Sequence, residues 1–141
     1  MFRQKTTFVI GAGASCELGL PSGETLKLQI LDLLQPTDDN VYGFVDKTMI
    51  EIMRLRVGPD VWEAQAKLAP MQQAAERIRR GLPLAMSIDN FLHSHYGDGD
   101  VEYLGKLAIA ICILRAEGSS HLFLQPDPLA SYRYEKTEKR L

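Results

Sequence analysis

The chain has 141 residues, of which 45% are hydrophobic and 24% are charged, and its formal net charge is -2. This length predicts one domain that can hold a hydrophobic core without disulfide bonds or structural metals. The net charge gives no electrostatic reason to expect nucleic acid binding. The two cysteines, Cys16 and Cys112, lie far apart with no Cys-x-x-Cys or Cys/His spacing, so neither a zinc site nor a disulfide framework is indicated, and a reducing cytoplasm fits best.

The first predicted element is a buried strand over residues 6–10, where a Phe-Val-Ile run follows two threonines without polar alternation. A glycine-rich turn comes directly after it. Gly11 and Gly13 lack a Cβ, so the backbone can turn sharply and bring its amides close to a diphosphate. Ser15 adds a hydroxyl donor at a helix start, where unpaired amides already favour negative charge. The turn is therefore predicted to bind phosphate groups.

The spacing of this turn is Gly-x-Gly-x-x-Cys, which differs from the usual dinucleotide fingerprint because Cys16 stands in place of its third glycine. The longer string, Gly11-Ala12-Gly13-Ala14-Ser15 followed by Gly19-Leu20-Pro21, resembles the first motif of the sirtuin superfamily. It is most similar to the bacterial sirtuin-like proteins, several of which cleave NAD in antiviral defence. The resemblance implies NAD as the cofactor, bound by Gly11, Ala12, Gly13, Ala14, Ser15, Gly19 and Pro21.

The sequence departs from the sirtuin-like protein deacylases at two points. After Gly-Leu-Pro a deacylase continues with an Asp-Phe-Arg type segment that helps to hold the nicotinamide end, whereas Ser22 and Gly23 follow here. The four zinc-ligand cysteines of a deacylase are also missing. Looser matches to the helical part of the sirtuin-like proteins occur at residues 87–92 and 105–110.

Downstream of the motif the apolar residues take a helical period. A stripe that starts at Leu26 predicts a helix of about three turns from Gly23, with Ser22 as its N-cap. A turn cluster at residues 36–40 precedes a second predicted helix over residues 41–57. A third is predicted from residue 61 to about residue 80, kinked or split at Pro70.

Two more helices are predicted before residue 124. Ser87 is a suitable N-cap for a helix over residues 88–95, and a turn at residues 97–100 leads into the last helix, residues 101–117. The apolar centre of this last segment also suits a buried strand, but its total length and flanking charges favour a helix. That centre, Leu107 to Leu114, is the longest apolar run and falls short of the roughly 18 residues of a bilayer span, so we expect a soluble protein with no membrane partner.

The elements together predict an incomplete α/β, Rossmann-like fold: one N-terminal strand and phosphate loop, then about five helices. Residues 1–124 are expected to be the N-terminal part of a sirtuin-like NAD-binding domain, and residues 125–141 a charged flexible tail. Such a loop lies at the edge of a parallel sheet, yet only one strand is predicted. The resemblance also implies an Asn-x-Asp strand and a catalytic histidine beyond residue 123, which this sequence lacks. We therefore expect a truncated chain that is inactive alone, or one whose sheet another chain completes.

One local cluster offers groups for cleaving a glycosidic bond. Asp89, Asn90 and His93 supply a carboxylate, an amide and a base. A structural role explains the same segment, because Ser87 caps a helix and an acidic residue suits its first turn. Both interpretations stay open. For Cys16 the alternatives are a reactive thiol and close packing behind the loop, and packing is predicted.

The leading hypothesis is an NAD-binding sirtuin-like domain whose complete form hydrolyses NAD to ADP-ribose and nicotinamide. The first alternative is a non-catalytic helical module that binds a nucleotide or a protein partner. The second is an NAD-dependent protein deacylase, which the missing Asp-Phe-Arg segment disfavours. Arginines at 54, 56, 77, 79 and 80 could bind nucleic acid or an acidic partner, and they fit solvated helix ends equally well, because the net charge opposes a broad basic surface.

Overall fold

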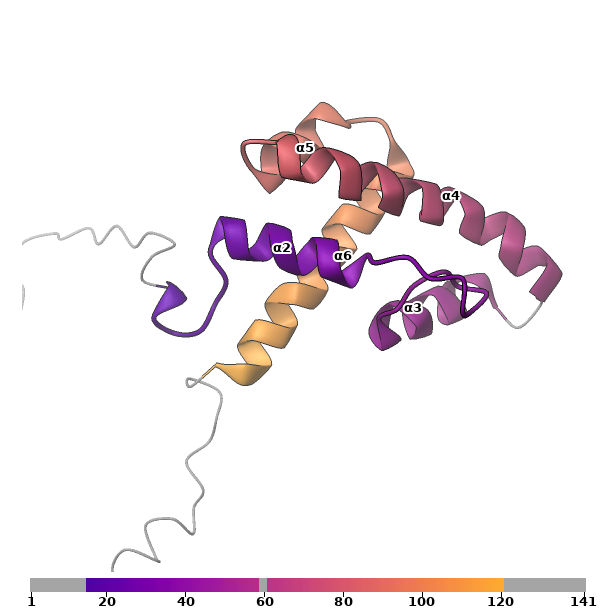
Figure 1. The fold of residues 1–141 in the computed structure, drawn as a ribbon, viewed down its shortest axis with the longest axis horizontal. Coiled ribbons are helices and arrows are strands. Elements are labelled where there is room, and N and C mark those ends of the chain that lie inside the picture. The colour runs from indigo at the N-terminus through magenta and orange to yellow at the C-terminus, as the bar shows by residue number, and fades with distance from the viewer. Residues whose placement is uncertain (1–14, 59–60, 121–141) are drawn as a thin grey trace, which may run out of the picture.

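The computed structural model describes residues 15–58 and 61–120, which form a set of packed helices (Figure 1). In chain order these are α2 (Gly23–Leu33), α3 (Lys47–Val57), α4 (Val61–Gly81), the 3₁₀ turn η1 (Leu82–Leu84), α5 (Ile88–Ser94) and α6 (Gly99–Ser119). Within these residues the only strand-like pairing is an isolated antiparallel bridge between Pro36 and Phe44. None of the described helices is long and apolar enough to cross a membrane.

The predicted α/β, Rossmann-like fold is wrong for the part of the chain that the structure describes. No sheet forms there, because the helices bury their apolar stripes on one another: α2 and α4 both pack against α6, and α3 packs against α4. The predicted strand over residues 6–10 and the predicted tail over residues 125–141 lie outside the described residues.

The predicted helices are present. The observed ends differ from the predicted ones where the sequence analysis did not recognise the capping residue. α2 begins as expected after Ser22, whose Oγ accepts a hydrogen bond from the amide of Thr25 at 3.2 Å. α3 begins at Lys47 rather than at residue 41, because Asp46 is its N-cap and the side chain of Asn40 organises the preceding loop. α4 runs as one helix past Pro70, so of the two predicted outcomes, a kink or a split, the split is wrong. Pro70 is exposed, where water can satisfy the carbonyl that proline leaves unpaired.

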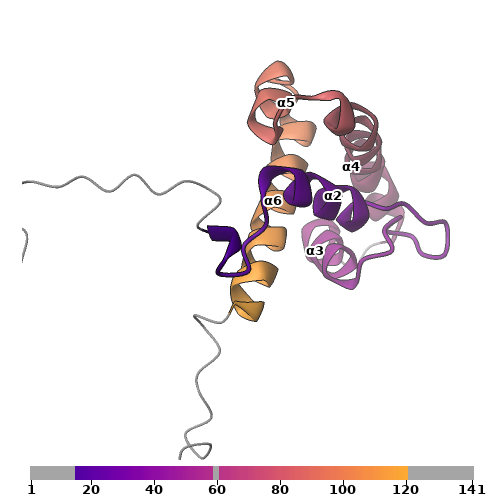
Figure 2. The ribbon, with the colours of Figure 1, turned by 60° about the vertical axis from the view of Figure 1, so that its left-hand side comes forward.

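α6 is the central helix of the described body. Its buried side contributes Val101, Leu104 and Ala108, each with no exposed surface, to a continuous apolar core. The two views in Figures 1 and 2 agree that α6 starts beside α5 and ends beside the turn that precedes α2. The helix prediction for this segment is therefore confirmed, and Asp98 caps its start by accepting from the amide of Val101 at 3.3 Å.

Gly81 allows α5 to approach the end of α4. A Cβ built on Gly81 would lie 2.6 Å from Cε2 of the buried Phe91 ring. We expect Gly81→Val to lower the free energy of unfolding by about 1 kcal/mol because the ring must shift, as measured by urea unfolding followed by circular dichroism. Gly118→Val is the matched control, since a Cβ there meets no atom within 4 Å. Equal effects of the two substitutions would contradict the close approach.

Candidate functional site

The structure describes three of the residues that the motif predicts to bind NAD: Ser15, Gly19 and Pro21. Ser15 starts a single turn in which its carbonyl accepts from the amide of Leu18 at 3.1 Å. Gly19 has φ +86°, a left-handed conformation that side chains rarely adopt, so the glycine at this motif position is explained by the backbone. Gly11, Ala12, Gly13 and Ala14 lie outside the described residues.

The turn at Ser15 to Gly19 is fixed to the C-terminal end of α6. The Oγ of Ser120, a residue that is 2% exposed, donates to the carbonyl oxygen of Leu18 at 2.6 Å. Figure 2 shows the turn lying beside the last turns of α6. The described end of the motif is therefore attached to the C-terminal end of α6.

The segment that follows the motif lines a cavity of about 230 Å³ between the N-terminal ends of α2 and α5. We call it the α2–α5 cavity; its lining consists of Gly23, Glu24, Leu26, Lys27, Met86, Ser87, Ile88, Asp89 and Ile109. The structure thus brings together two parts that sequence reasoning treated separately, the motif's exit into α2 and the segment that carries Asp89.

Lys27 holds the two sides of the α2–α5 cavity together. It is 8% exposed, and its Nζ donates to the carbonyl oxygens of Ala85 at 2.9 Å and Met86 at 3.4 Å, and to Oε1 of Glu24 at 2.9 Å. Three acceptors satisfy the three donors of the ammonium group, which makes burial of the charge tolerable. Sequence reasoning missed this residue, although a lysine three positions before the buried Ile30 was a signal for it.

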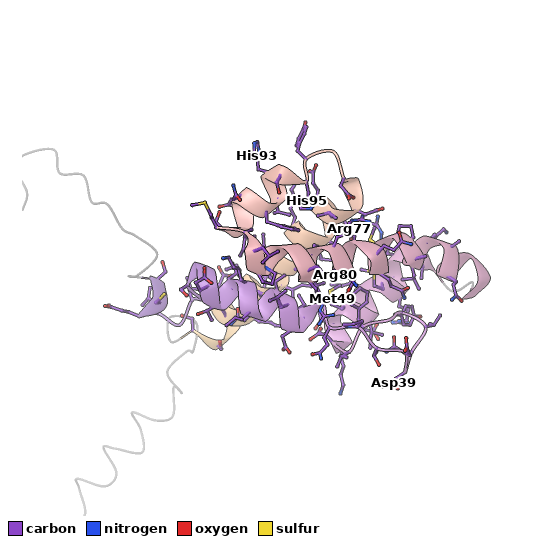
Figure 3. All side chains as sticks on the ribbon, turned by 45° about the horizontal axis from the view of Figure 1, so that its top comes forward. Asp39, Met49, Arg77, Arg80, His93 and His95 are labelled. Atoms are coloured by element: carbon purple, nitrogen blue, oxygen red, sulfur yellow. The ribbon has the colours of Figure 1, made fainter. Side chains whose placement is uncertain are left out.

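The predicted catalytic cluster is only partly assembled. Asp89 lines the α2–α5 cavity, whereas Asn90 and His93 do not. All three side chains are exposed, and Ser87 caps α5 by accepting from the amide of Asn90 at 3.1 Å. The predicted structural role of Ser87, as the N-cap of this helix, is therefore confirmed. Figure 3 shows His93 on α5, and of the three predicted groups only Asp89 faces a cavity.

A second cavity of about 250 Å³ lies between α2 and α6, next to the turn at Gly19. Its lining includes Asp32 from α2, and Cys112 and Arg115 from α6. Burial raises the pKa of the Cys112 thiol, which makes it a poor nucleophile. Cys16 is exposed, so the predicted packing of that thiol behind the loop is wrong.

The arginine groups of the described helices are engaged mostly by neighbouring acids. Arg54 pairs with Glu51 at 2.7 Å, and Arg80 pairs with Glu76 at 2.6 Å, each within one helix. Arg77 pairs with Asp98 at 3.1 Å. This arrangement is typical of solvated helix faces. In the described ranges no group of three or more His, Cys, Asp or Glu side chains could hold a metal ion.

No family model, no curated protein and no solved structure matches the chain. The residues and cavities described above are therefore the basis on which a function can be inferred.

Proposed function

We propose that the chain is an NAD-binding, sirtuin-like domain whose complete form hydrolyses NAD to ADP-ribose and nicotinamide. The observation that supports it best is the α2–α5 cavity, which begins directly after the motif and contains Asp89 on its opposite wall. A nucleotide held by the motif and a carboxylate at the rim of an adjacent cavity are two of the parts that cleavage of a charged glycoside uses.

In this proposal the motif and the cavity hold different parts of the dinucleotide. Gly11, Ala12, Gly13, Ala14 and Ser15 hold the diphosphate through backbone amides and a hydroxyl. The cavity is smaller than the roughly 300–1,000 Å³ of usual ligand pockets, so it takes one end only. Glu24 is paired with Lys27 at 2.9 Å, so Asp89 is the carboxylate of the lining that suits the end with the cationic nicotinamide ring.

Calorimetric titration with NAD and with ADP-ribose tests the proposal. We expect Gly13→Val to weaken both ligands by about tenfold or more, because a branched side chain blocks the approach of the diphosphate. We expect Asp89→Ala to weaken NAD and to leave ADP-ribose unchanged, since ADP-ribose lacks the cationic ring. Gly118→Val and Asp39→Ala are the matched controls; Asp39 is exposed and lies away from α5 in Figure 3.

Absence of heat with both ligands for the unmodified chain would contradict every nucleotide function. Nicotinamide release is followed by chromatography in the same samples. We expect binding without release from this chain alone, because neither Asn90 nor His93 reaches the cavity to act beside Asp89. If the unmodified chain released nicotinamide and Asp89→Ala did not, hydrolysis would instead be assigned to the α2–α5 cavity.

A further inference from the structure

The α2–α6 cavity, as we call the space of about 250 Å³ between these two helices, has no role in the proposed function. It lies beside the end of the motif, because Gly19 lines it and the turn that Gly19 ends is fixed to the end of α6. Helix α2 packs across α6 (Figure 1). The polar side chains of the lining come from both helices and are those of Gln29, Asp32, Arg115 and Ser119.

Asp32 and Gln29 bring unused hydrogen-bonding groups to this cavity. Within residues 15–58 and 61–120, no group forms a hydrogen bond or an ion pair with the carboxylate of Asp32 or with the side-chain amide of Gln29. Burial raises the pKa of the Cys112 thiol, and the negative charge of Asp32 adds to this shift, so the carboxylate lies near the wall that α6 provides. The α2 side of the cavity therefore offers a carboxylate and an amide to a ligand.

Arg115 is fixed on the α6 side with part of its guanidinium group unused. Its Nη2 donates to Oδ1 of Asp46 at 2.8 Å and to Oγ1 of Thr48 at 2.6 Å, which holds the group in the lining of the cavity. Among the described residues nothing accepts from its Nε or Nη1, so these donors remain for a ligand. Donors of Arg115 and the acceptor oxygens of Asp32 thus line the same space.

This combination of charges favours a neutral group with several hydroxyls over an anion or an apolar ligand. A phosphate would lie next to the carboxylate of Asp32, and an apolar ligand would remove water from that carboxylate without replacing its hydrogen bonds. The two hydroxyls of a ribose can both donate to one carboxylate, and their oxygens can accept from Arg115. Adenine adds an edge that donates and accepts, as the amide of Gln29 does, and a face for the buried side chains of Leu33 and Cys112.

We infer that the α2–α6 cavity binds the adenosine end of the dinucleotide, with Asp32 accepting hydrogen bonds from the ribose hydroxyls. The identity of the ligand rests on the proposed function, which assigns sites only to the diphosphate and to the nicotinamide end. The cavity is smaller than the roughly 300–1,000 Å³ of usual ligand pockets, so it takes one nucleoside rather than a whole dinucleotide. Leu26 in the α2–α5 cavity and Asp32 in this one are separated by about 9 Å of rise along α2, so a single dinucleotide can reach both cavities.

Separate titrations with the two halves of NAD, adenosine monophosphate and nicotinamide mononucleotide, test the inference in a calorimeter. We expect Asp32→Asn to weaken adenosine monophosphate by about tenfold or more, because hydrogen bonds to a charged acceptor are lost, and to leave nicotinamide mononucleotide unchanged. Asp89→Ala should give the opposite pattern. Asp39→Asn is the matched control, since Asp39 is exposed and does not line this cavity. If the unmodified chain does not bind adenosine monophosphate, or if Asp32→Asn binds it equally well, the inference is overturned.

A ligand without the ribose hydroxyls shows whether Asp32 contacts them. We expect the unmodified chain to bind 2′,3′-dideoxyadenosine monophosphate about tenfold more weakly than adenosine monophosphate, and Asp32→Asn to bind the two equally. Independent losses from the two changes overturn the inference. NAD binding that depends on Asp89 but not on Asp32 contradicts the inference alone. Adenosine monophosphate binding that depends on Asp32, without any binding of nicotinamide mononucleotide, supports the inference and contradicts the proposed function alone.

Discussion

Replacing Leu104 with alanine is expected to lower the free energy of unfolding by about 2–5 kcal/mol. Leu104 has no exposed surface and lies on the side of α6 that enters the common core. Truncation removes buried methyl groups and leaves a cavity that helices packed on two sides cannot close fully. Urea unfolding followed by circular dichroism measures the change, and for a body of this size the midpoint temperature should fall by roughly 10 °C or more.

Leu55→Ala is the control for this substitution. Leu55 is 77% exposed on α3, so the same chemical change should cost less than about 0.5 kcal/mol. The contrast isolates the contribution of burial, because both residues lie inside helices. If the two variants unfolded at the same urea concentration, α6 would not be the packing centre of the body.

Much of the helical part could be predicted because its signals are local. The period of 3.6 and the capping residues Ser22 and Ser87 act within one helix, and α2 and α5 begin where these residues indicate. The start of α3 could not be placed in this way. The apolar spacing suggested a helical turn at this place. Instead, the side chain of Asn40 accepts hydrogen bonds from the amides of Tyr42 and Gly43 and holds the segment as a loop.

The sheet was inferred from a motif, and a motif does not say how the rest of the chain is buried. The described helices pack on one another, and α6 contacts both α2 and α4, so their apolar stripes are covered without a sheet. The site shows the same limit. Asp89 shares a cavity with the start of α2 because Lys27 bridges to the carbonyl oxygens of Ala85 and Met86. These contacts join residues far apart in sequence, so local patterns do not predict them.

Replacing Asp46 with alanine is expected to cost about 2 kcal/mol of stability, since the residue has two roles. Its Oδ1 caps α3 by accepting from the amides of Thr48 at 2.9 Å and Met49 at 3.1 Å. The same oxygen accepts from Nη2 of Arg115 at 2.8 Å, which links α3 to α6. Arg115 is about half exposed, so solvent screening reduces the share of the ion pair and the cap supplies the larger part.

The stability that Asp46 contributes should depend on pH in a defined direction. Partial burial raises the pKa of Asp46, but the hydrogen bonds from Arg115 and from the amides of Met49 and Thr48 outweigh it, so the folded pKa lies below the ordinary value of 3.8. The charge-dependent part of the contribution is therefore complete above the unfolded pKa and is lost as pH falls through the folded one. In urea titrations the gap between the unmodified chain and Asp46→Ala should be constant above about pH 5 and should narrow below about pH 4, towards the part that a neutral cap still contributes.

Asp46→Asn separates the two roles of Asp46. Asparagine is as good an N-cap as aspartate but carries no charge for Arg115, so it should cost less than alanine. Its cost relative to the unmodified chain should fade at low pH, where Asp46 itself becomes neutral, while the difference between the asparagine and alanine variants should persist. If asparagine cost as much as alanine at neutral pH, the ion pair with Arg115 rather than the cap would hold α3 against α6.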